Sequence, residues 1–346
     1  MSKLEIGGIQ ATPGSRFSVD LPVANLYTHT PLTMPVRVIC GKKPGPVMFI
    51  TAALHGDELN GVEIIRRLLR QPALKRLRGT LLAMPIVNVH GFIDRSRYLP
   101  DRRDLNRSFP GKESGSLAAR IAHGIVTEVV AKCDYGIDLH TGAIHRSNLP
   151  QVRAHLAHEQ TRQLAEAFGA PVILDSRPAA GTLREYTTGN DIPVLLYEAG
   201  EALRFDETCI RVGVRGVLNV LRALEMLPKP SRPARLRPTT IASGSAWARA
   251  EASGVLRTYA ALGERIAEGQ LLAHVTDPFG EVETELLAPF SGLVIGKLNL
   301  PLVFEGEAVF HIARARGAQA AAAEWEKLQT VDDMPDTVIT DEPAIV

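Results

Sequence analysis

Three residues in two distant parts of the chain have the types and spacing to hold a metal ion. His55 and Glu58 stand three positions apart after the apolar run 46–51, and His140 follows a second apolar run far downstream. A tight turn after a strand aims an imidazole and a carboxylate at one point, and His140 would arrive from another strand end. Two nitrogens and one carboxylate leave a coordination position free. That is the arrangement of a catalytic rather than a structural zinc, because the free position holds the water that the metal acidifies.

The His-x-x-Glu spacing is weak evidence by itself, because it often occurs by chance and a single histidine is more often a packed or surface residue. Three other features support the metal site. They are the Asp-Leu-Asn-Arg run at 104–107, the strand-like residues just before His140, and the Tyr-Glu-Ala-Gly run at 197–200. Several such motifs in one chain make an accidental match much less frequent.

The elements that must position these residues follow an alternating α/β pattern between about 46 and 227. Short apolar runs predict strands, and amphipathic stretches predict helices on a largely parallel or mixed sheet. The expected strands are 47–53, 80–86, 135–139, 171–175 and 193–198. Helices are expected to begin at 61 and 117, and a last one to cover 206–226. The motifs thus fall at strand ends.

Composition limits the classes of function. The 346 residues suffice for two domains, and 39 Lys plus Arg against 38 Asp plus Glu create no overall field for nucleic acid or a membrane surface. Cys40, Cys133 and Cys209 are widely spaced, which is typical of reduced thiols in the cytoplasm. The N-terminus has no long apolar core, and no stretch is long enough to span a bilayer. We therefore expect a cytoplasmic protein without nucleic-acid or membrane partners.

The chain changes character after the proline-rich segment 228–233, which predicts a linker. Short glycine-punctuated strands over 241–314 resemble the lipoyl/biotinyl-type barrel-sandwich hybrid. The biotin carriers of that fold have a lysine eight residues before the proline that is Pro289 here, whereas this chain has Glu281. A swinging cofactor is thus not expected, and the module is interpreted as a lid, a spacer or a contact between subunits. The predicted domains are a catalytic domain over 1–230 (core 45–227) and the β-rich module over 241–314. They are followed by a tail over 315–346, in which an Ala-rich helical piece precedes a flexible acidic segment at 332–336.

Taken in order, these motifs resemble the succinylglutamate desuccinylase/aspartoacylase family of the zinc carboxypeptidase superfamily. The resemblance rests on these runs and single residues: His-Gly-Asp-Glu at 55–58, Pro85, Asn88, Asp-Leu-Asn-Arg-Ser-Phe-Pro-Gly at 104–111, Asp-Leu-His at 138–140, and Glu198. It covers most of residues 45–200, and a C-terminal barrel-like module also occurs in the family. The resemblance implies a zinc-carboxypeptidase-like mixed sheet flanked by helices, and it suggests a homo-oligomer.

The same resemblance implies roles for individual residues. His55, Glu58 and His140 match the ligands of one Zn²⁺ per chain, and Glu198 matches the glutamate that takes a proton from water and passes it to the leaving amine. Glu198 also follows an apolar run, which places a partly desolvated carboxylate at the carboxyl end of a strand. The alternative interpretation is that Glu198 is an exposed carboxylate at the end of a strand without a catalytic role. Asp138 lies two residues before His140, so strand alternation puts both on one face, where Asp138 can orient the imidazole or make a structural hydrogen bond.

Arginines in the matching segments predict an anionic substrate. Asn106 and Arg107 match the family's grip on a substrate carboxylate, because a planar guanidinium makes a bidentate contact that lysine cannot imitate. Arg97 resembles the family's arginine that holds the polarised carbonyl oxygen. Arg184 is a candidate for the acyl or amino-acid end of the substrate, or a surface helix residue. The alternatives to Arg97 in the same loop are Arg95, Arg102 and Arg103, and some of these four arginines belong to a solvated basic loop.

The sequence therefore predicts a zinc-dependent amidohydrolase that removes an acyl group from an N-acyl amino acid or similar small amine by cleaving a linear amide C–N bond. A zinc carboxypeptidase acting on a small peptide is the alternative within enzymes, because the same metal, glutamate and arginine serve that reaction. A non-catalytic metal-binding interaction protein is the alternative from another class. A lipoyl or biotin carrier is the third, and Glu281 argues against it.

Overall fold

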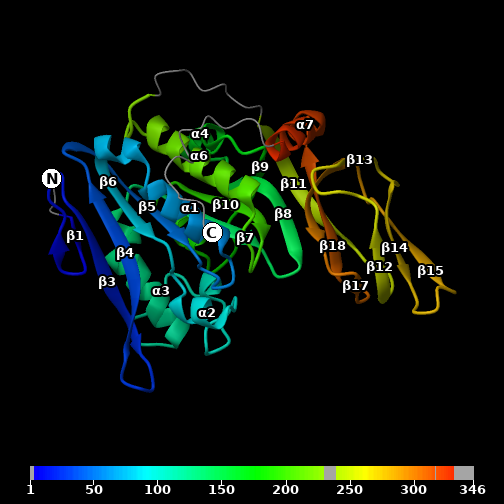
Figure 1. Ribbon diagram of the computed structural model, residues 1–346, viewed down its shortest axis with the longest axis horizontal. Coiled ribbons are helices and arrows are strands. Elements are labelled where there is room, and N and C mark those ends of the chain that lie inside the picture. The colour runs from blue at the N-terminus through cyan, green and yellow to red at the C-terminus, as the bar shows by residue number, and fades with distance from the viewer. Residues whose placement is uncertain (1–3, 230–238, 316, 331–346) are drawn as a thin grey trace, which may run out of the picture.

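The computed structural model describes residues 4–229, 239–315 and 317–330, and a twelve-stranded mixed β-sheet runs through it (Figure 1). The strand order is β13-β16-β18-β11-β9-β8-β10-β7-β5-β6-β4-β3. In chain order these strands are β3 (Arg16–Asn25), β4 (Pro31–Cys40), β5 (Lys43–Ala52), β6 (Arg78–Met84), β7 (Tyr135–Gly142), β8 (Arg146–Ala154), β9 (Val172–Asp175), β10 (Val194–Glu201), β11 (Thr240–Arg249), β13 (Arg265–Ile266), β16 (Gly292–Leu298) and β18 (Ala308–Ala315). A separate hairpin joins β1 (Glu5–Ile6) and β2 (Ile9–Gln10).

The five strands expected from the sequence are β5, β6, β7, β9 and β10, with bounds that differ by a few residues. β6, β5, β7 and β10 lie side by side and parallel, so their carboxyl ends meet at one edge of the sheet. The loops that leave this edge carry the predicted metal ligands. The sequence did not predict β3, β4 or β8, of which β8 is antiparallel to β10 and parallel to β9.

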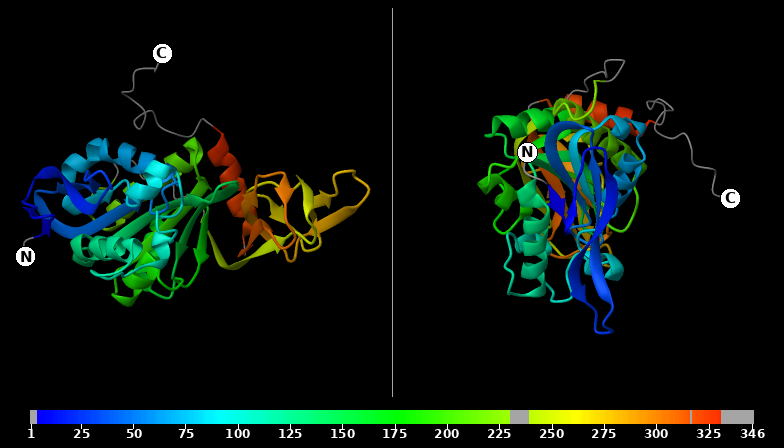
Figure 2. Two further views of the ribbon diagram at one scale, coloured as in Figure 1. Left: turned by 90° about the horizontal axis from the view of Figure 1, so that it is seen from below. Right: turned by 90° about the vertical axis from the view of Figure 1, so that its left-hand side faces the viewer.

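Helices cover both faces of the sheet (Figure 2). One face packs against α1 (Asn60–Leu69), α4 (Glu159–Phe168), α6 (Glu207–Ala223) and α7 (Ala318–Gln329), and the other against α2 (Val89–Asp94), α3 (Leu117–Glu128) and α5 (Leu183–Gly189). Short 3₁₀ turns are η1 (Pro72–Arg76), η2 (Leu105–Arg107) and η3 (Val130–Lys132). α6 is the helix expected over 206–226; it begins where the Asp206 carboxylate accepts the Cys209 N–H at 2.9 Å. No described helix has the length and apolarity needed to cross a membrane.

The C-terminal part is rich in β-structure and has its own apolar core. A second sheet has the order β15-β14-β12-β17, from β12 (Gly254–Thr258), β14 (Leu271–Thr276), β15 (Glu283–Leu287) and β17 (Leu302–Val303). The other strands of this part extend the main sheet, because β11 pairs with β9 and β16 pairs with β8. Glu281 is exposed in the turn between β14 and β15. The expected linker from residue 230 onward and the acidic segment 332–336 lie outside the described residues.

Candidate metal centre and substrate pocket

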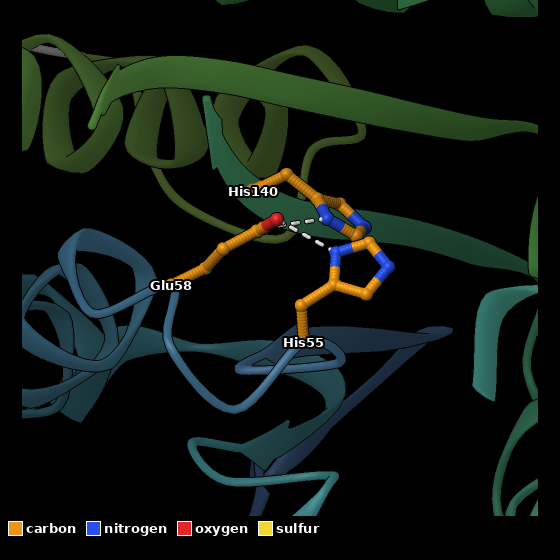
Figure 3. Close-up of side chains that lie close together, drawn as sticks. All are labelled: His55, Glu58 and His140. Atoms are coloured by element: carbon orange, nitrogen blue, oxygen red, sulfur yellow. Dashed lines mark hydrogen bonds and ion pairs between the residues drawn. The ribbon is translucent and has the colours of Figure 1, made fainter. Parts of the chain in front are cut away.

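The three predicted metal ligands converge on one point at the carboxyl edge of the sheet. One ligand atom from each of His55, Glu58 and His140 lies within 4.8 Å of the others, and all three residues are buried. The Nδ1 atoms of His55 and His140 face the two carboxylate oxygens of Glu58 at 2.7 and 2.8 Å (Figure 3). His55 and Glu58 come from the loop after β5, and His140 comes from β7.

Further carboxylates hold the remaining ring nitrogens. His140 Nε2 lies 2.8 Å from Asp138 Oδ2, and Asp138 Oδ1 accepts the hydroxyl of Thr51 at 2.7 Å. His55 Nε2 lies 3.2 Å from Asp104 Oδ1. Each imidazole therefore presents Nδ1 to the cluster while its other nitrogen is occupied, which is the usual way that a protein orients histidine ligands. Two imidazole nitrogens and one carboxylate with an open side fit the donor set of Zn²⁺.

The charges of this cluster are strongly coupled. Burial alone would raise the pKa of Glu58, but the two adjacent imidazoles outweigh it and hold that pKa well below its usual value. Burial would lower the pKa of His140, yet Asp138 and Glu58 raise it well above the ordinary histidine value. Desolvation likewise opposes ionisation of Asp104, and His55 and Arg97 overcome it, so its pKa is lowered. The site is built to keep its carboxylates ionised beside positive charge.

Close backbone packing sets the position of the first two ligands. A Cβ atom on Gly56 would lie 1.9 Å from the carbonyl carbon of Gly91 in α2, so only glycine allows this approach. The Asn88 side chain caps α2 by accepting the Gly91 N–H at 2.8 Å. The loop that carries His55 and Glu58 is thus held against a capped helix. This packing explains a His-Gly sequence directly after the strand.

The cluster opens into a pocket of about 610 Å³. Its described lining residues include seven arginines and three glutamates: Arg97, Arg107, Arg146, Arg153, Arg177, Arg184, Arg249, Glu58, Glu198 and Glu307. The excess of positive charge favours an anionic ligand. The volume is within the range of about 300–1,000 Å³ that is typical of small-molecule sites.

Glu198 lines this pocket from β10, next to His140 of β7 in the sheet register. Arg153 of β8 forms an ion pair with it, with Nε 2.5 Å from Glu198 Oε2. Arg184 of α5 lies in the same pocket and is only 8% exposed, so it is not a surface helix residue. Burial and the neighbouring Arg153 lower the pKa of Arg184 to about 10. A buried guanidinium beside a second one gains stability when an anion binds.

The other predicted residues surround the metal cluster. Arg97 Nη2 donates to Asp104 Oδ2 at 3.0 Å, and Arg97 Nη1 lies 3.5 Å from Glu58 Oε1. Asn106 and Arg107 line the pocket from η2, where Asn106 Oδ1 accepts the Leu183 N–H at 3.0 Å. Four arginines were candidates for holding the carbonyl oxygen of the substrate. The described pocket lining contains Arg97 but not the other three, which are Arg95, Arg102 and Arg103.

Some pocket residues were not foreseen from the sequence. Arg153 could not be predicted as a pocket residue, because β8 was not predicted and the ion pair of Arg153 with Glu198 depends on the pairing of β8 with β10. Trp247 and Arg249 of β11 line the same pocket from the C-terminal part, which was expected to be a lid, spacer or subunit contact. Arg146 joins these two parts through an ion pair with Glu307 at 3.2 Å. No local motif marks such residues, because they come together only in the folded sheet.

Comparisons with known proteins agree on one family. The model of the succinylglutamate desuccinylase/aspartoacylase catalytic domain matches residues 44–224. The chain is 26% identical over 271 residues to the N-alpha-acetyl-L-2,4-diaminobutyric acid deacetylase of Halomonas elongata. This match covers 75% of this chain and 79% of that protein.

Solved structures share the fold over most of their length. The product-bound ectoine utilization protein EutE (DoeB) of Ruegeria pomeroyi superposes with a TM-score of 0.78 at 25% identity, over 88% of this chain and 96% of that one. A succinylglutamate desuccinylase/aspartoacylase of Rhodobacter sphaeroides gives a TM-score of 0.77 at 24% identity, over 87% and 96%. The family model matches more than half of the residues of this chain. The chain therefore belongs to the succinylglutamate desuccinylase/aspartoacylase family.

Proposed function

We propose that this protein is a zinc-dependent hydrolase that cleaves the amide bond of an N-acyl amino acid or a related small N-acyl amine. The observation that carries the proposal is one pocket that joins the His55–Glu58–His140 cluster to Glu198 and to an excess of arginines. The similarity to a deacetylase of an N-acetylated amino acid supports the same reaction class. The products are a carboxylate and a free amine.

His55, Glu58 and His140 would hold one Zn²⁺ per chain, because their donor atoms converge and their second nitrogens are occupied by Asp138 and Asp104. The ion would act as a Lewis acid that makes water more acidic and polarises the amide carbonyl. Arg97, within 3.5 Å of Glu58, stands where its guanidinium can donate to the carbonyl oxygen as negative charge develops there.

Glu198 is the proposed general base. It takes a proton from the water that attacks the carbonyl carbon and passes it to the amine nitrogen as the C–N bond breaks. Arg153 positions the carboxylate through the ion pair. Arg184, Asn106 and Arg107 would bind the carboxylate of the substrate, which matches the positive excess of the pocket.

We also infer a zinc-carboxypeptidase-like sheet, since the ligands leave the carboxyl ends of the neighbouring parallel strands β5 and β7. The division into a catalytic part, a barrel-sandwich-like part and a tail stays a prediction, as does a homo-oligomer. The cytoplasmic location rests on Cys40, Cys133 and Cys209, which are all free thiols.

The substitution Glu198→Gln tests the mechanism. Removing the base while keeping the side-chain shape should lower kcat by at least about a hundredfold, since general acid–base catalysis contributes roughly 10²–10⁴-fold. Turnover is measured on a panel of N-acyl amino acids and small peptides, with zinc content determined on the same samples. Glu166→Gln, an exposed carboxylate on α4, is the control and should keep full activity. Near-normal turnover in zinc-loaded Glu198→Gln protein would contradict the role. Cleavage of peptides alone would favour the carboxypeptidase.

A further inference from the structure

A second hollow of about 570 Å³ lies at the end of the sheet opposite the metal cluster. We call it the basic hollow, because its lining cations are Lys42, Lys43, Lys75, Arg76, Arg78 and Arg222, with Lys229 as a seventh. Lys43 opens β5 and Arg78 opens β6, whereas His55 follows the other end of β5. The two pockets therefore open at opposite ends of the same parallel strands.

Three chain segments far apart in sequence form the basic hollow. They are the start of β5, the η1 turn with the start of β6, and the end of α6 with the residues that follow it. Buried Leu77 and Leu227 belong to its apolar lining, and the Arg78 N–H donates to the carbonyl of Met226 at 2.8 Å. The backbone at Leu77, Arg78 and Leu227 is thus part of the folded core.

The hollow carries a large excess of positive charge, with seven cations against one carboxylate in its described lining. Glu225 is the one acidic residue among its described lining residues, and within the described part of the chain it forms no ion pair with the seven cations. Lys43 and Arg78 stand at matching positions at the start of the parallel strands β5 and β6, so two like charges lie on neighbouring strands and repel each other. The guanidinium of Arg222 has the amide oxygen of Asn219, at 3.1 Å, as its one described partner, and burial lowers the pKa of Arg222. This local excess stands in a chain whose formal net charge is +1.

We propose that the basic hollow is a second ligand site, which binds a small polyphosphate group, either inorganic or on a nucleotide. A concavity lined by one sign of charge concentrates counter-ions, and a ligand with several negative charges relieves the mutual repulsion of the cations. Lysine ammonium groups act as point charges that suit phosphate oxygens. The volume admits a compact ligand, and the cations gather in one hollow rather than along a stripe that could follow a nucleic-acid backbone.

The test is calorimetric titration of metal-loaded protein with inorganic tripolyphosphate, a nucleoside triphosphate and orthophosphate, all at one ionic strength. The variant Lys43→Glu/Lys75→Glu reverses two exposed charges from different segments of the hollow. The control Arg265→Glu/Lys327→Glu makes the same change in net charge at exposed cations of the C-terminal part. Any chelation of the catalytic metal by the ligand is common to all three proteins.

We expect one saturable tripolyphosphate site per chain, with affinity at least about tenfold lower in the hollow variant and within about twofold of wild type in the control. Orthophosphate should bind much more weakly, and added salt should weaken all binding. Equal affinity for tripolyphosphate and the nucleoside triphosphate would show that the site recognises the phosphate chain alone. Tighter binding of the nucleoside triphosphate would show that the site recognises a nucleotide.

Absence of saturable binding to wild-type protein would overturn the proposal. So would equal affinity in wild type and the hollow variant, which would place the anion in the arginine-rich catalytic pocket. Melting temperature and deacylase activity are measured on each variant, and both should stay close to wild type. If the charge reversals impair folding, Lys43→Gln/Lys75→Gln repeats the test by charge removal alone. Because deacylase turnover is followed separately, failure of this site leaves the proposed function untouched.

Discussion

His140 shows how the nearest neighbours of one side chain determine its chemistry. Asp138 takes Nε2, so Nδ1 is the nitrogen left to face Glu58. Asp138 is itself fully buried and held by Thr51, which fixes the imidazole from behind. Such partners typically change metal affinity by about 10–100-fold when they are lost. The chemistry of His140 therefore depends on two residues, Asp138 and Thr51, that lie behind the proposed metal site.

We predict that the wild-type chain carries about one zinc ion and that His140→Ala loses it, because the cluster then keeps too few donors for a stable site. Metal content is measured by elemental mass spectrometry on untagged protein. His123→Ala, at a partly exposed histidine on α3 outside the pocket, should retain the metal. Wild-type protein without zinc, even after zinc is offered, would overturn the metal site, and so would equal zinc content in wild type and His140→Ala.

Packing between elements decides where His55 and Glu58, the first two proposed ligands, stand. The loop after β5 is pressed onto α2 at Gly56 and Gly91, with no space for a side chain. His55 and Glu58 lie on either side of this contact. Any shift of the loop therefore moves both donors relative to His140, which is anchored on a different strand.

The substitution Gly56→Ala tests this contact. The added Cβ would fall 1.9 Å from a backbone carbon, so we expect a loss of unfolding free energy of at least about 2 kcal/mol, as for overpacked cores, together with weaker zinc binding. The measurements are urea unfolding and zinc content. Gly124→Ala on α3 is the matched control, because no atom lies within 4 Å of its added Cβ. It should leave zinc binding intact and raise stability by up to about 1 kcal/mol. Equal behaviour of the two variants would contradict the packing argument.

At the scale of the whole molecule, the sheet connects the catalytic part to the C-terminal part. β11 pairs with β9 and places Trp247 and Arg249 in the pocket. Trp247 is stacked on His311 of β18 with ring centroids 4.6 Å apart, and this contact holds the tryptophan in place. The C-terminal strands therefore form a wall of the pocket that also contains His55, Glu58 and His140. They are remote from these three residues in sequence but belong to the same sheet.

We predict that Arg249→Met raises KM by about tenfold with little change in kcat, because it removes a cation that lines the pocket and would attract the anionic substrate without taking part in the reaction. Steady-state kinetics with the best N-acyl substrate check this. Arg257→Met on β12 removes another exposed arginine of the same region that does not line the pocket, and its kinetics should equal wild type. A large fall in kcat at unchanged KM would show that Arg249 does not act by substrate binding.

The positions of His55, Glu58, His140 and Glu198 at or near the carboxyl ends of strands could be predicted from local sequence. Apolar runs that must be buried between two layers of helices leave little choice of structure, and polar residues directly after them fall at the sheet edge. Strand alternation also predicted that Asp138 and His140 lie on one face of the strand, and the structure shows that Asp138 holds the imidazole at 2.8 Å.

The surroundings of these four residues could not be predicted, because they depend on how the strands pair in the folded sheet. Arg146, Asn148 and Arg153 of β8 line the pocket. Because these residues are polar, β8 lacks the continuous apolar run from which a central strand is predicted. The ion pair of Arg153 with Glu198 and the wall built by Trp247 join segments that no spacing rule connects. Local sequence determines where a strand ends, because burial acts residue by residue. Which strands become neighbours depends on the packing of the whole sheet, and so does the shape of the pocket between them.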